Sequence, residues 1–201
     1  ETYVQQGIVK DTTTARTFTS QMLSQNLQYT DAALVSLAFD AAENNDIKKI
    51  IELDELCTAV KLPQEMRQAS NKLGLRLMKI FQPLGKNTLT EKYADNIRQQ
   101  NILGHYCIAF GLYAHTMKIS KKEALTGFYY NAAVGFVTNS VKLVPLSQQS
   151  GQEILFSLHT LINDLAEKSL QPYEELIGLC CTGFDIKCMQ HERLYSRLYM
   201  S

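Results

Sequence analysis

A chain of 201 residues with 45% hydrophobic and 20% charged residues is typical of one large globular domain, not of a disordered protein. Lys plus Arg and Asp plus Glu both number 20, so the net charge of zero gives no general attraction to nucleic acid or anionic lipid. The sequence also has no run near the roughly 18 to 20 apolar residues that span a bilayer, so we expect neither nucleic acid nor membrane as a partner.

Hydrophobic residues recur with a helical period from the start of the chain. Asp11 is a candidate cap for a helix that carries Phe18 on its apolar side, and Asp31 can start a second helix that is apolar almost all round. We expect this second helix to be central. Ile47 opens a third helix, and Leu62-Pro63 ends it and begins the next. The predicted core stripe of that fourth helix is Met66, Ala69, Ser70, Leu73, Leu77 and Ile80.

Three matches to the Ser/Thr-x-x-Glu capping box support further helix starts. They are Thr88 with Glu91, Ser120 with Glu123, and Ser150 with Glu153. Between the first two, an apolar stripe runs from His105 to Thr116, and after the third a single helix is expected to continue to Leu165. Gln171-Pro172 can begin a short helix. The pattern predicts an all-α, single-domain bundle of about nine helices over residues 1–201.

Enzyme signatures are sparse in this sequence: it contains no phosphate-binding loop, dinucleotide fingerprint, nucleophile elbow or HExxH helix. We therefore predict no catalytic residue and no cofactor. His105 and His115 are expected to be interior or interfacial histidines with a polar partner each.

The five cysteines are Cys57, Cys107, Cys180, Cys181 and Cys188. Two of them lie in apolar helical contexts, which favours a reduced, cytoplasmic protein. Cys180, Cys188 and His191 are the best metal-ligand candidates by residue type, because Cys188-x-x-His191 has a chelating spacing. A helical metal-binding protein or metalloenzyme is therefore the alternative interpretation of the sequence.

Two stretches indicate binding of another protein. In Ser140–Leu155, a polar loop leads into a helix N-terminus, where amide donors can hold an anion or a partner's backbone. The chain ends in QHERLYSRLYMS, residues 190–201. If that segment is extended, Arg193, Tyr195, Arg197 and Tyr199 form one ladder of the kind favoured at interfaces, whereas a helix would distribute them differently. The sequence leaves this choice open.

These two stretches also resemble the urease accessory protein UreF family. The resembling segments are ETYVQQGIV, RQASNKLGLRLMKI, GHYCIAFGLYAH, AAVGFVTNSVKLVPLSQQSGQEIL and HERLYSRLYMS. Ser147 departs from the family's usual glycine and Lys142 from its common arginine. The family normally carries a further segment before the position of Glu1.

The resemblance implies an all-α scaffold without catalysis of its own, which is needed for nickel insertion into apo-urease. It implies that the protein joins the accessory protein UreD (also called UreH), recruits and regulates the GTPase UreG, and forms a homodimer, with residues 190–201 as a docking tail. The partner-binding positions that match the family pattern are Lys142, Pro145, Gln148, Gly151, Gln152, His191, Glu192, Arg193, Tyr195, Arg197 and Leu198.

Overall fold

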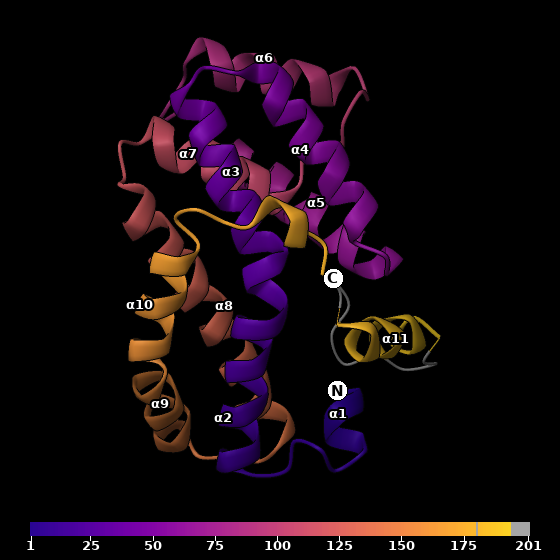
Figure 1. The fold of residues 1–201 in the computed structure, drawn as a ribbon. Coiled ribbons are helices and arrows are strands. Elements are labelled where there is room, and N and C mark those ends of the chain that lie inside the picture. Colours follow the sequence, from indigo (N-terminus) through magenta and orange to yellow (C-terminus); the bar gives the residue numbers. More distant parts are fainter. Residues whose placement is uncertain (180, 194–201) are drawn as a thin grey trace.

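The computed structural model describes residues 1–179 and 181–193, which form eleven α-helices and no strand (Figure 1). This confirms the all-α prediction, with a helix count close to the expected nine. The α-helices are α1 (Thr2–Gln5), α2 (Thr12–Gln21), α3 (Asp31–Glu43), α4 (Ile47–Val60), α5 (Gln64–Phe81), α6 (Thr88–Arg98), α7 (Tyr106–Thr116), α8 (Lys121–Leu143), α9 (Gln148–Ser157), α10 (His159–Lys168) and α11 (Thr182–His191). Short π and 3-10 turns lie at Met22–Asn26, Leu27–Tyr29 and Glu174–Leu176.

The helices form two groups, one around each end of a long helical rod. In Figure 1, α2 leads through its π turn directly into α3, so that one nearly continuous rod runs the length of the molecule. Helices α4, α5, α6 and α7 surround the α3 end, and α8, α9 and α10 surround the α2 end. No helix in the described ranges is long and apolar enough to cross a membrane.

The central position predicted for the second helix is confirmed. Nine residues of α3 are buried, including Leu34, Val35 and Phe39, and α3 packs mainly on α7. Asp31 begins this helix without capping it, because its carboxylate instead accepts hydrogen bonds from Nζ of Lys61 at 2.7 and 2.8 Å. The polar start of α3 is thereby fixed to the end of α4.

Asp11 caps α2 as predicted, and of the three predicted Ser/Thr-x-x-Glu boxes one is confirmed. Ser120 and Glu123 form the predicted box on α8. The predictions at Thr88 and Ser150 were wrong, because α6 is capped one residue earlier by Asn87 and α9 three residues earlier by Ser147. The single helix expected from Glu153 to Leu165 is also interrupted, since α9 ends before Leu158 and α10 begins after it.

The core stripe predicted for α5 is confirmed at Ser70, and Ala69 and Leu77 are half-buried, but it was wrong for Met66, Leu73 and Ile80. The buried residues of α5 are Ser70, Gly74 and Met78, whereas Met66, Leu73 and Ile80 are exposed. The reason is a close backbone approach: a Cβ on Gly74 would lie 2.1 Å from the carbonyl oxygen of Gly104. Only the small-residue side of α5 fits against this loop, so the larger apolar side chains stay outside.

The loop that meets Gly74 is itself held by a buried carboxylate. Asp54 of α4 accepts hydrogen bonds from the backbone N–H groups of Leu103, Gly104 and His105 at 2.9 to 3.1 Å. It also accepts one from the hydroxyl of Tyr93 at 2.7 Å. Gly104 has φ +82°, a backbone conformation that glycine adopts without strain. The loop therefore depends on α4, α5 and α6 together.

Candidate partner-docking site

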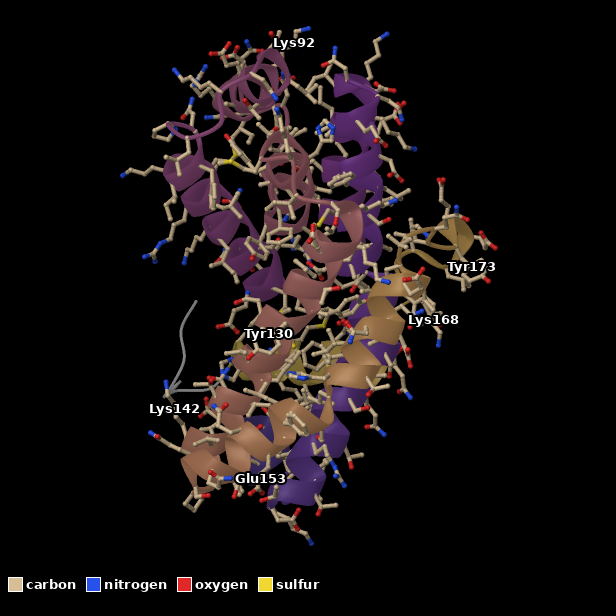
Figure 2. All side chains as sticks on the ribbon, turned by 90° about the vertical axis from the view of Figure 1, so that its left-hand side faces the viewer. Lys92, Tyr130, Lys142, Glu153, Lys168 and Tyr173 are labelled. Atoms are coloured by element: carbon tan, nitrogen blue, oxygen red, sulfur yellow. The ribbon has the colours of Figure 1, made fainter. Side chains whose placement is uncertain are left out.

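The first set of predicted positions lies at the corner between α8 and α9. Lys142, Pro145, Gln148 and Gln152 are exposed there, and Figure 2 shows Lys142 and Glu153 at this end of the molecule. Gly151 is buried instead, because a Cβ at this position would lie 2.9 Å from Cγ2 of Val141. The corner therefore presents four of these five side chains outward, while Gly151 allows α9 to approach α8 closely.

Ser147 explains how this corner tolerates the missing glycine. Its φ of −71° and ψ of 155° are ordinary extended values, so no backbone angle at this position requires glycine. Its hydroxyl oxygen accepts a hydrogen bond from the backbone N–H of Ser150 at 3.0 Å and so caps α9. The serine side chain therefore caps α9, and the conformational freedom of a glycine is not needed at this position.

An aromatic face lies beside the corner and was missed from the sequence. Phe156 is 76% exposed and Tyr130 44% exposed, and both rings lie close to that of His159, at centroid distances of 5.5 and 6.3 Å. Phe156 follows Gln152 by four residues, so the two share a side of α9. This four-residue spacing is the sequence feature that could have indicated the aromatic face. Exposed aromatic side chains of this kind are enriched at protein interfaces.

The second set of predicted positions begins on α11, which lies beside α1 and packs on α5 (Figure 1). None of the ten residues of α11 is buried. Polar contacts hold its end instead: Nδ1 of His191 lies 2.9 Å from a carboxylate oxygen of Glu65, and Nε2 lies 3.2 Å from one of Glu1. An imidazolium ring would donate a hydrogen bond to each carboxylate.

Glu192 makes the other contact between α11 and the body. Its carboxylate accepts a hydrogen bond at 3.0 Å from the backbone N–H of Glu65, in the first turn of α5. Helix α5 has Pro63 at its cap position, which supplies no side-chain hydrogen bond. A residue 127 positions away thus satisfies a donor that the helix itself leaves open.

Two cavities lie around α1, between α11 and the bundle. One cavity of about 220 Å³ is lined by residues of α1, α5 and α11, among them Tyr3, Met66 and Phe184. A second, of about 190 Å³, is lined by Tyr3, Phe184 and the end of α8, including Leu143. Tyr3 and Phe184 line both cavities, and the second cavity reaches the end of α8 at Leu143. Arg193 is the last described residue of the second set, and Tyr195, Arg197 and Leu198 lie outside the described residues.

Comparison with known proteins identifies the family. The sequence pattern of UreF matches residues 9–159. The chain belongs to the UreF family. A protein named urease accessory protein UreF from Actinobacillus pleuropneumoniae serotype 5b (strain L20) is 45% identical over 201 residues, covering all of this chain and 88% of the relative. The protein of that name from Haemophilus influenzae (strain ATCC 51907 / DSM 11121 / KW20 / Rd) is also 45% identical, over 86% of its length, and that from Sporosarcina pasteurii is 30% identical over both whole chains.

These relatives are named accessory proteins and not enzymes, which agrees with the prediction that this UreF family member is no enzyme. The described residues contain no group of three or more His, Cys, Asp or Glu placed to hold a metal ion. His105 is an interior histidine, buried between the hydroxyls of Thr58 at 2.9 Å and Ser70 at 3.1 Å.

The two described metal-ligand candidates, Cys188 and His191, belong to no metal-binding group among the described residues. Cys180 lies outside the described residues, and His191 contacts two carboxylates. Partial burial, followed by the negative charges of Asp185, Glu65 and Glu192, raises the pKa of the half-buried Cys188 thiol to about 12. A thiol that stays protonated at neutral pH is a poor metal ligand and a poor nucleophile.

Proposed function

We propose that this protein is an adaptor of urease maturation, needed for nickel insertion into apo-urease. In this role it joins the UreD/UreH accessory protein and recruits and regulates the GTPase UreG, with nickel as cargo of the assembly. Membership of the UreF family and the printed names of its relatives support this proposal.

The observation that carries the proposal is the construction of α11. This helix buries no residue and is attached to the body by polar contacts at His191 and Glu192. Cavities line its inner side, so apolar groups such as Phe184 and Met66 are only partly used within the chain. A partner that fills this region gains apolar contact without unfolding the bundle. We therefore assign residues 190–201, including Arg193, Tyr195, Arg197 and Leu198, to the UreD/UreH docking tail.

The second part of the proposal concerns self-association and the GTPase. The aromatic face of Tyr130, Phe156 and His159 has the composition of an interface centre, and we propose that it supports a homodimer. Gln148 and Gln152 border this face on α9, and Lys142 and Pro145 lie at the adjoining corner. We place the contact with UreG near that border. Cytoplasmic location follows from this role and fits the four described free cysteines.

Co-purification with the purified partners tests the proposal. The full chain is expected to retain UreD/UreH, and the resulting complex to retain UreG in a nucleotide-dependent manner. Deletion of Leu194–Ser201 should leave a folded domain that no longer retains UreD/UreH. Retention by the truncated chain would remove the tail from the proposal, and failure of the full chain to bind either protein would overturn the adaptor function.

The alternative function, a metalloprotein built on Cys180, Cys188 and His191, predicts a different result. The purified protein would contain a stoichiometric metal ion that is lost in Cys188→Ser. Metal analysis of both proteins distinguishes the two functions, because the adaptor proposal requires no resident ion.

A further inference from the structure

An exposed apolar row along α5 and its flanking residues is not used by the core, and only its member in the first turn, Met66, also lines a cavity of the docking region described above. We call it the α5 strip. It consists of Leu62, Met66, Leu73, Ile80 and Leu84, which are 38 to 69% exposed. Met66, Leu73 and Ile80 follow one another at intervals of seven residues. At 100° per residue, each interval rotates the side chain by 20° less than two full turns, so the three side chains form one line along the helix. The line is about 20 Å long at 1.5 Å per residue.

The fold itself holds these side chains outside. Gly74 and Ser70 must face the Gly104 loop, since a Cβ on Gly74 would also lie 2.9 Å from the backbone nitrogen of Tyr106. Helix α5 cannot rotate to bury Leu73 or Ile80 without losing this contact. Within the described residues α5 packs on α7 along its length and meets α11 only near its first turns. The strip is therefore fixed in its orientation, and no described part of the chain covers it at Leu73 or Ile80.

Positive charge borders the strip on the side away from the core. Residues 62–86 contain five Lys or Arg and a single acidic residue, Glu65, in a chain whose total charge is zero. Arg76 lies three residues after Leu73 and four before Ile80, and Lys79 lies on the same flank. In the described part of the chain neither Arg76 nor Lys79 forms an ion pair with a carboxylate.

The positive charge beside the apolar row makes a second copy of the chain an unfavourable binding partner for the α5 strip. A two-fold interface centred on the strip would place the strip of one copy against that of the other, and so bring Arg76 and Lys79 towards their own counterparts. Like charges facing each other across a closing apolar contact are unfavourable. A binding partner whose apolar row is bordered by carboxylates complements both the apolar side chains and the positive charges of the α5 strip.

We propose that the α5 strip binds an amphipathic helix of another protein whose apolar row is flanked by Asp and Glu. This inference rests on the proposed adaptor function and extends it, because it adds a third surface distinct from α11 and from the aromatic face. The partner's apolar side chains cover Leu73 and Ile80, and its carboxylates pair with Arg76 and Lys79.

Binding measurements with purified full-length UreD/UreH, UreG and apo-urease, each used separately, test the inference. Two variants remove one feature each: Leu73→Gln with Ile80→Gln, and Arg76→Glu with Lys79→Glu. The matched control, Lys48→Glu with Lys92→Glu, makes the same charge change at exposed lysines of α4 and α6. We expect one of the three partners to bind both strip variants at least tenfold more weakly and the control as tightly as wild type. Thermal unfolding should show all variants folded, since every altered side chain is exposed.

Photocrosslinking identifies the occupant. With Leu73→p-benzoylphenylalanine, the crosslinked peptide should come from a helix of that partner and carry apolar and acidic residues on one side. Crosslinks only to a second copy, or unchanged affinities in both strip variants, would overturn the inference while leaving the adaptor function intact. Flotation with vesicles of phosphatidylglycerol and phosphatidylcholine that is lost in Arg76→Glu with Lys79→Glu would assign the strip to a membrane and also overturn it. If wild type binds none of the three proteins, the adaptor function itself fails.

Discussion

The carboxylate of Glu192 accepts a hydrogen bond at 3.0 Å from the backbone N–H of Glu65, so the end of α11 caps the beginning of α5. This contact joins the C-terminal docking region to the body through one of the free donors at a helix N-terminus. It also places Glu192, at the start of the proposed docking tail, beside the first turn of the helix that carries the α5 strip.

We expect Glu192→Ala to loosen α11 without unfolding the bundle. Loss of a cap costs about 1 kcal/mol, and α11 buries no residue that would couple its opening to the core. Hydrogen exchange in residues 182–191 should therefore accelerate about fivefold, while the free energy of global unfolding changes little. Glu175→Ala, at another exposed acidic position, is the control. A global loss of stability in Glu192→Ala would contradict a local cap.

Gly74→Ala should be the most damaging glycine substitution. The added Cβ would lie 2.1 Å from the carbonyl oxygen of Gly104, and backbone on both sides cannot yield as a flexible side chain can. We expect a loss above about 3 kcal/mol in urea unfolding. Gly127→Ala on α8 is the matched control, since its Cβ meets nothing within 4 Å. There the better helix propensity of alanine should stabilise the protein by about 0.5–1 kcal/mol.

Asp54→Asn should destabilise the protein by about 3 kcal/mol. The amide has one acceptor oxygen where the carboxylate serves four donors, so its NH₂ group would face at least one buried N–H or O–H. Tyr93→Phe removes one donor and leaves the three backbone donors satisfied, so a smaller loss of about 1 kcal/mol is expected. Equal losses for the two variants in urea unfolding would show that the loop contacts of Asp54 contribute little.

Ser147→Gly and Ser147→Ala separate the two ways of starting α9. Because Ser147 has ordinary extended angles and acts through its hydroxyl, glycine should cost only a few tenths of a kcal/mol, and alanine about 1 kcal/mol. Thermal unfolding of both variants measures the difference. A gain of stability with glycine would indicate backbone strain at this position.

The Lys61–Asp31 ion pair gives a prediction for alkaline pH. Burial, the largest single effect, would lower the pKa of Lys61, but the attraction and hydrogen bonding of the Asp31 carboxylate, together with the electrostatic effects of Cys107 and Cys57, outweigh it, so the pKa lies above its ordinary value. A raised lysine pKa adds stability that is complete below the unfolded pKa of about 10.4 and is lost as the pH rises through the folded pKa.

Lys61→Met should therefore cost about 3 kcal/mol at pH 8, because it leaves a partly buried carboxylate without its partner. The difference in unfolding free energy between wild type and variant should stay constant up to about pH 10 and shrink above it. A difference that grows with pH would contradict the pair as the source of stability.

The sequence alone determined the helical class, because the 3.6-residue spacing of apolar side chains depends only on helix geometry. It also determined that α3 is central, since a helix apolar all round must be buried. The segments that resemble the UreF family indicated the α8–α9 corner. Acidic and hydroxyl-bearing residues indicated where most helices begin. They did not always identify the capping residue itself, because neighbouring side chains compete for that role, as Asn87 and Thr88 do at the start of α6.

Tertiary structure alone decided which side of α5 faces inward. Periodicity favours Leu73 and Ile80 for the core, but the backbone of Gly104–Tyr106 comes so close that only the Gly74 side fits. Likewise, no local pattern indicates that Glu192 caps a helix 127 residues earlier or that Asp54 holds a loop 49 to 51 residues later. These contacts form between segments distant in the chain, so their partners are defined only once the helices are packed.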